Sequence, residues 1–137
     1  MIGCTETVTV VNLWHDKAAG RDVYCCHVFH GCSWYARQIH TADTAGLHRS
    51  ALHQIRIPEA SAAGAVYCEP DVWAALPAEQ RTAAWTLGQN AKLVLGELRS
   101  LDEAGYAALT KRFTVAAGLS WHDNRGRANP HWYVEGS

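Results

Sequence analysis

The residues best suited to chemistry are the cysteines and histidines between positions 25 and 32. This stretch, CCHVFHGC, holds Cys25, Cys26, His27, His30 and Cys32. Thiolate and imidazole are ligands that zinc prefers, and alternate residues of a strand point to the same face of a sheet. Cys25 and His27 could therefore bind one zinc ion. A third ligand would have to come from a distant position such as Cys68 or His53.

The spacing of these residues argues against a metal site. The chain has no pair of cysteines in CxxC spacing and no pair of histidines in HxxxH spacing, which are patterns that carry a metal-binding mechanism. Adjacent Cys25 and Cys26 would point to opposite faces of a strand and could not chelate together. A free cysteine also packs well as a small apolar residue. We therefore predict no metal ligand and no cofactor.

A cysteine nucleophile with a histidine base is the second chemical possibility, because a neighbouring imidazolium stabilises a thiolate. With five cysteines and eight histidines in 137 residues, however, such pairs arise by chance. Thiols without a chemical role explain the pattern better, so we predict no catalytic residue and no enzymatic activity. A small zinc-binding protein or a thiol enzyme built on cysteine and histidine is the alternative from another functional class.

Two further polar groups have simple structural explanations. The segment Asp123–Arg125 and His131, beside Trp132, could mark a polar pocket, but a turn followed by a half-exposed strand accounts for them. The adjacent acids Asp102 and Glu103 fall in the sequence SLDE, which predicts a helix capping box. The glycines lack the spacing of a phosphate-binding loop.

The charge and cysteine content exclude several classes of protein. Twelve basic and thirteen acidic residues give a net charge of −1, whereas a general nucleic-acid or membrane-surface binder shows a basic excess. The odd number of cysteines predicts reduced thiols made in a cytosol rather than a disulfide framework. The N-terminal stretch MIGCTETVTVV lacks the basic region and apolar core of a signal peptide. No apolar run approaches the roughly 20 residues that span a bilayer.

Alternating apolar and polar residues predict that the chain is built mainly from strands. Leu93–Leu95, within Trp85–Leu98, is the clearest buried strand and is expected at the centre of the sheet. Residues 7–14 and 23–37 are expected to form a hairpin, with a bulge at Gly31. Shorter strands are expected at residues 51–57, 66–68, 113–121 and 131–134, the last two forming a C-terminal hairpin.

The remaining segments are predicted as one helix and two loops. The capping box that begins at Ser100 predicts a helix over residues 101–111, and Pro70 can open a shorter helical segment over residues 71–76. Residues 38–50 and 59–84 are expected to be insertion loops at the ends of the fold. Together these elements predict a single domain over residues 1–137, a small β-barrel or sandwich of about six or seven strands with one short helix and long end loops.

Three stretches of the chain resemble small virion proteins of tailed bacteriophages. The first is TVTVVNLW…VYCCHVFHGCSWYAR, which contains the element His-Gly-x-x-Trp at residues 30–34. The second runs from the strand GQNAKLVLGEL to the strand FTVAAGLSWHDN. The third is the ending PHWYVEG, which carries His-aromatic-x-Val-x-Gly at residues 131–136. The segments 38–50 and 59–84 contain no matching motif.

The resemblance implies a structural component of the head–tail connector, most similar to head-closure, or stopper, proteins. Such a protein would assemble as a homo-oligomeric ring between the portal or adaptor and the tail, with tail-completion proteins as neighbours. DNA would pass through without sequence-specific binding, and the chain would be made in the bacterial host cytoplasm and end in the virion. A tail-completion or other minor virion protein of the same fold is the alternative within this class.

Overall fold

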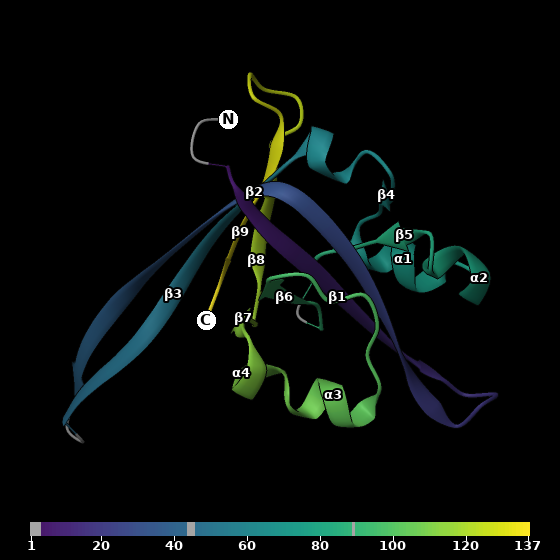
Figure 1. Cartoon of the computed structure of the whole chain (residues 1–137), viewed down its shortest axis with the longest axis horizontal. Coiled ribbons are helices and arrows are strands. Elements are labelled where there is room, and N and C mark those ends of the chain that lie inside the picture. The colour runs from purple at the N-terminus through teal and green to yellow at the C-terminus, as the bar shows by residue number, and fades with distance from the viewer. Residues whose placement is uncertain (1–3, 44–45, 89) are drawn as a thin grey trace.

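A hairpin of two long strands organises the fold, which is seen in a computed structural model that describes residues 4–43, 46–88 and 90–137 (Figure 1). Strands β1 (Glu6–Asp16) and β2 (Arg21–Asp43) pair in antiparallel fashion from Asp16 and Arg21 to Glu6 and Cys32. The ladder shifts register between Val8 and Glu6, opposite Gly31, whose φ angle is +76°. The expected hairpin and its bulge at Gly31 are therefore confirmed.

The segment expected as an insertion loop at residues 38–50 is instead a continuation of strands, so that prediction was wrong. Strand β3 (Gly46–Pro58) pairs with β2 from Ser33 and Arg56 out to Asp43 and Gly46. We call residues 33–43 and 46–52 of this hairpin the arm, and Figure 1 shows it extending away from the rest of the molecule. The polar composition suggested a loop, but a two-stranded ribbon pairs the backbone groups on the inner edges of its strands without needing an apolar face.

The other strands are short. They are β4 (Val66–Tyr67), β5 (Ala84–Trp85), β6 (Lys92–Leu95), β7 (Thr114–Ala116), β8 (Ser120–Asp123) and β9 (His131–Gly136). Seven strands form one antiparallel sheet in the order β7-β6-β1-β2-β3-β9-β8, and β4 pairs with β5 in parallel. The predicted mainly β class is confirmed. The expected C-terminal hairpin forms between β8 and β9, but the single strand expected over residues 113–121 is divided into β7 and β8, and β7 pairs with β6 instead.

The two ends of the sheet approach each other, but in the described residues no continuous strand ladder joins them into a closed barrel. The edge strands β7 and β8 follow one another along the chain, separated only by Ala117–Leu119. Beyond β7 and β9, Ala117 and Ser137 exchange two backbone hydrogen bonds of 3.0 Å each. The sheet therefore curls around its inner face and is joined at one point between its ends.

The inner face of this curled sheet holds the main core. Val8 and Val10 of β1 are fully buried there, as expected from the alternation of residues 7–14, and so is Leu93 of β6, from the continuous apolar run. The aromatic centre of this core consists of Phe29, Tyr67, Trp85 and Trp132. The strand β6 is thus confirmed as a buried strand, paired on both sides by β1 and β7.

A smaller apolar cluster lies on the opposite face of β1 and β6. There Val11 and Val94 pack with Leu109 beneath the helices α3 (Glu103–Ala107) and α4 (Leu109–Arg112). The single helix expected over residues 101–111 is therefore split in two at Ala108. The expected cap at Ser100 was also wrong, because the side chain of Asp102 accepts the cap hydrogen bond. SLDE fits a capping box starting at serine, but an aspartate two positions on can cap equally well.

The second expected insertion loop, residues 59–84, is also largely regular. It contains a 3-10 turn η1 (Glu59–Ala62), strand β4, and helices α1 (Pro70–Ala75) and α2 (Ala78–Arg81). The short helix after Pro70 was predicted correctly. The strand expected at residues 66–68 is present as β4, and the segment is anchored by Trp73 and Tyr67, which pack inward although their neighbours are small and polar.

Candidate functional site

The cysteine and histidine pair singled out from the sequence does share a face of β2. The Sγ atom of Cys25 lies 3.9 Å from Nε2 of His27 and also approaches the carbonyl oxygens of residues 81 and 82. His53 lies elsewhere, where it accepts a 3.0 Å hydrogen bond from the indole of Trp34. No group of three histidine, cysteine, aspartate or glutamate side chains in residues 4–38, 51–88 and 90–137 is arranged to hold a metal ion.

The environment of the thiols keeps them protonated at neutral pH. Burial raises the pKa of Cys25 above its ordinary value. Burial and the neighbouring Cys25 raise the pKa of Cys26 to about 11, and burial with a contribution from Cys4 raises that of Cys32 to about 12. Because the thiolate is the nucleophile, burial leaves these three thiols mainly in their less reactive, protonated form.

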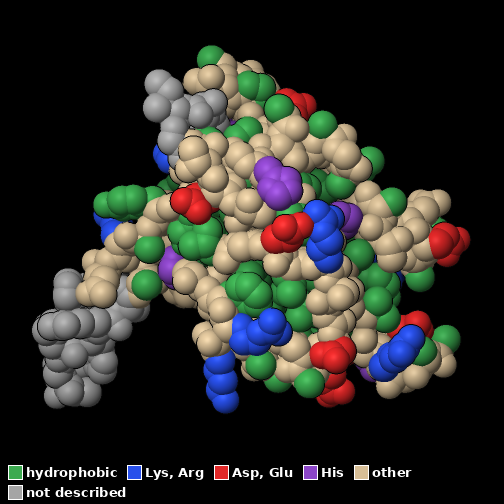
Figure 2. Space-filling view, in the orientation of Figure 1, with side chains coloured by type: hydrophobic (Ala, Val, Ile, Leu, Met, Phe, Trp, Pro, Cys, Tyr) green, Lys and Arg blue, Asp and Glu red, His purple; other side chains and the backbone are tan. Residues whose placement is uncertain are grey.

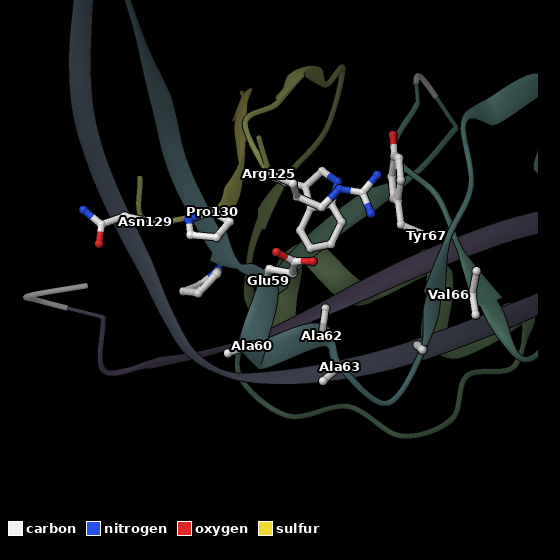
Figure 3. Close-up of a pocket in the computed structure, with 12 residues that line it drawn as sticks. Glu59, Ala60, Ala62, Ala63, Val66, Tyr67, Arg125, Asn129 and Pro130 are labelled. Carbon is white, nitrogen blue, oxygen red and sulfur yellow. The ribbon is translucent and has the colours of Figure 1, made fainter. Parts of the chain in front are cut away.

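A cavity of about 630 Å³ opens between η1, β4 and the β8–β9 turn (Figure 3). Its walls are mainly alanine and proline side chains with the aromatic residues Tyr67 and Trp132. The guanidinium carbon of Arg125 lies 5.5 Å from the ring centre of Tyr67 and 4.8 Å from that of Trp132. In Figure 3 the carboxylate of Glu59 points into the same space.

The positive charge of Arg125 in this cavity is neutralised by Asp123. Arg125 donates from Nε and Nη2 to the two carboxylate oxygens of Asp123, at 2.9 and 2.7 Å. These hydrogen bonds hold the pKa of Asp123 below its usual value. Asp123–Arg125 is thus both the turn and the polar wall that the sequence suggested, while His131 turns to the carbonyl of Asn129. The aromatic partner Tyr67 had no local sequence signal.

The arm presents backbone edges that lack partners among the described residues. The ladder between β1 and β2 ends at Cys32, and the ladder between β3 and β9 ends at His53. Beyond these points the outer edges of residues 33–43 and 46–52 face no other strand of the described chain. Tyr35, on the arm, is 60% exposed. Open edges of this length are templates for pairing with another chain.

The face of the molecule seen in Figure 2 carries no dominant charge of one sign. Figure 2 shows acidic and basic side chains mixed over the visible face, without a continuous patch of either. Several of these charges are paired locally, as in the ion pair between Arg99 and Glu97. No helix in the described residues is long and apolar enough to cross a membrane.

Comparison with known proteins identifies the family. A family model described as a family of unknown function, DUF6751, matches residues 3–137. The chain belongs to this family. No curated protein and no solved structure matches it. For this DUF6751 member, function has to be argued from the arrangement of its own residues.

Proposed function

We propose that this DUF6751 protein is a structural subunit of the head–tail connector of a tailed phage, with a head-closure role and without enzymatic activity. The proposal combines the resemblance of its strand motifs to small virion proteins with one structural observation. That observation is the arm, whose two long backbone edges have no partner among the described residues. A protein built to stay alone normally shortens, charges or covers such edges.

The geometry of the arm suits a ring of identical subunits. The outer edge of β2 and the outer edge of β3 lie on opposite sides of the same hairpin. Pairing the β2 edge of one copy with the β3 edge of the next is a head-to-tail contact, and such a contact closes into a ring when it repeats around an axis. Main-chain hydrogen bonds would supply the affinity, as in other cases of strand addition.

The mixed surface charge supports a position beside DNA without tight binding to it. A protein that neutralises many phosphates binds DNA tightly and in a salt-dependent way. The net charge of −1 and the interspersed signs in Figure 2 fit a wall past which DNA moves. The portal or adaptor and the tail-completion proteins would then be the axial neighbours of the ring.

Shortening the arm tests the assembly role. Ile39 and Ser50 are ladder partners, so residues 40–49 can be replaced by Asn-Gly, a two-residue turn that suits a hairpin. We expect the full chain to form a ring of defined mass in native mass spectrometry and the shortened chain to remain monomeric with its melting temperature retained. Lys17→Ala, in the exposed β1–β2 turn, is the control and should assemble normally.

The location of the protein tests the virion role independently. Mass spectrometry of purified particles should detect the chain at a fixed number of copies, and cryo-electron microscopy should place it between portal and tail. Density at the tail end instead would favour the tail-completion alternative. Absence from particles, together with a monomeric full-length chain at high concentration, would rule out the proposal.

A further inference from the structure

A second cavity, of about 330 Å³, lies between β1, α1, α2 and the segment that leads into β6. Asn12 fixes one wall, because its buried side-chain amide donates to the Thr86 carbonyl at 2.8 Å and accepts from the Thr86 N–H at 3.2 Å. Trp73 fixes another, with its indole N–H donating to the carbonyl of Ala84 at 3.3 Å. The cavity is therefore bounded by side chains held in place by buried hydrogen bonds.

Two indole rings and one guanidinium meet in this cavity. The rings of Trp14 and Trp73 pack edge to face, with centres 5.6 Å apart and an interplanar angle of 74°. The guanidinium carbon of Arg81 lies 5.7 Å from the Trp14 ring centre and 5.9 Å from that of Trp73. An arginine stacked on aromatic rings is pre-organised for planar anions such as carboxylates.

The donors of this arginine are only partly used. Nη2 of Arg81 donates to the carbonyl oxygen of Ala74 at 2.7 Å. Its Nε is buried without a hydrogen-bond partner among the described residues. A guanidinium has five N–H donors, and no acidic side chain of the described chain lies within ion-pair distance of Arg81.

Charge distinguishes this cavity from two others. In the cavity of Figure 3, Arg125 is neutralised by its ion pair with Asp123. A third cavity, beside the β1–β2 turn, contains Arg21 together with Asp22, Asp102 and Glu103. The lining of the cavity at Arg81 contains no acidic residue, so it carries one uncompensated positive charge next to apolar walls.

We propose that this cavity binds a carboxylate attached to a flat apolar or aromatic group. The carboxylate pairs with the guanidinium of Arg81, and the apolar group lies against Trp14, Trp73 and Pro70. A small apolar pocket with a single charged group that fixes orientation is the usual form of a ligand site. A free organic acid and the C-terminal carboxylate of a peptide share this chemistry.

The unmodified protein provides the first test. The protein is titrated with 3-phenylpropionate and, separately, with its neutral amide, which has nearly the same shape. Binding is followed by the NMR signals of the Trp14 and Trp73 indole N–H groups. We expect the acid to bind with saturation and the amide at least about tenfold more weakly, since only the acid forms a charge-assisted pair. The same comparison with a short peptide ending in phenylalanine, as free acid and as amide, tells which source is preferred.

Substitutions of Arg81 test whether the acid binds at this residue. Arg81→Gln should remove the discrimination between acid and amide in both series, and Arg81→Lys should restore part of it because the charge returns without the planar fork. Arg112→Gln makes the same change of charge on α4, outside the cavity, and should have no effect. Equal binding of acid and amide by the unmodified protein, or no binding of either, would overturn the proposal without reliance on any variant.

Discussion

At the scale of single residues, Gly136 sets how closely the two ends of the sheet approach. A Cβ atom at this position would lie 2.8 Å from the carbonyl oxygen of Ala117 and 2.8 Å from Cδ2 of Leu119. Real Cβ atoms essentially never come so close, and the carbonyl belongs to the backbone that exchanges hydrogen bonds with Ser137. Gly136 is therefore required by close approach and not by backbone conformation.

Gly136→Ala should destabilise the protein by about 1–3 kcal/mol, the usual cost of overpacking a tight site. The measurement is the free energy of unfolding in urea. Gly126→Ala is the matched control, because a Cβ there meets nothing within 4 Å, and its free energy of unfolding should be unchanged or slightly raised. Equal effects of the two substitutions would contradict the close approach at Gly136.

His53 makes stability depend on pH. Burial lowers the pKa of His53 below its ordinary value, and Trp34 donates to the ring nitrogen that would otherwise take the proton. The unfolded chain binds this proton near pH 6.5, whereas the folded chain does so only at lower pH. The free energy of unfolding should thus fall as pH falls through about 6.5 and level off below the folded pKa.

The free energy of unfolding in urea, measured between pH 5 and 8 in steps of about 0.5 unit, checks this expectation. The decrease should begin near the reference histidine pKa of about 6.5. His53→Gln should flatten the profile below pH 6.5 relative to the parent chain, although the part due to His27, whose pKa is also lowered by burial, stays. An NMR titration of His53 with a pKa at or above about 6.5 would contradict the prediction.

At the scale of elements, α3 shows how a local signal can be assigned to the wrong residue. The sequence SLDE suggested Ser100 as the cap, but Asp102 accepts the hydrogen bond from the Gly105 N–H at 2.7 Å. Both residue types are good caps. What decides between them is where the chain turns to place Leu109 over Val11 and Val94, which is a tertiary contact.

Asp102→Ala should lower the free energy of unfolding by about 1 kcal/mol, the typical value for loss of an N-cap. Asp102→Asn keeps the acceptor and should recover most of this loss. Ser100→Ala should change the stability by less than about 0.5 kcal/mol, as expected for an exposed site away from such features. Denaturant unfolding of the three variants measures the differences, and a larger loss for Ser100→Ala would restore the original assignment.

The arm shows why composition misled at residues 38–50. The prediction rested on polarity, and a strand with one buried face would have shown alternating apolar residues. The arm pairs its two strands with each other and leaves their outer edges open, so packing did not impose that alternation. The strand register continues outward from the ladder pair of half-buried Trp34 and buried Ile55, and local composition cannot reveal this.

At the scale of the whole molecule, one aromatic cluster connects segments that are distant in sequence. The ring centre of Trp85 lies 4.9 Å from that of Phe29, 4.9 Å from that of Tyr67 and 4.8 Å from that of Trp132. These residues belong to β2, β4, β5 and β9. The segment at residues 59–84 and the C-terminal hairpin are thereby held to the same core.

Trp85→Ala should cost about 3–5 kcal/mol, because it leaves a cavity at the centre of this cluster. Domains of this size are stable by only about 5–15 kcal/mol, so we expect a strongly lowered urea midpoint or loss of cooperative unfolding. Tyr35→Ala removes an aromatic side chain that is 60% exposed and should leave the monomer's stability nearly unchanged. A Trp85→Ala midpoint close to that of the parent chain would show that the cluster does not hold the fold together.

Local sequence patterns were enough to predict the strands that face the core. Alternation between apolar and polar neighbours indicated Val8, Val10, Ile55 and Ile57, and a continuous apolar run indicated Leu93. The bulge at Gly31 and the hairpins at both ends of the chain follow from equally local turn signals. The shared face of Cys25 and His27 was predicted for the same reason.

Which side chains meet depends on the folded arrangement and could not be predicted from local patterns. Trp14, Trp73 and Arg81 come from a strand and two separate helices, and Tyr67 and Arg125 from segments far apart in the chain. No spacing rule connects such positions, because their distances depend on how the sheet curls and where the short helices pack. The uncompensated charge of Arg81 and the open edges of the arm are likewise properties of the assembled fold, since each depends on which neighbours are absent in space.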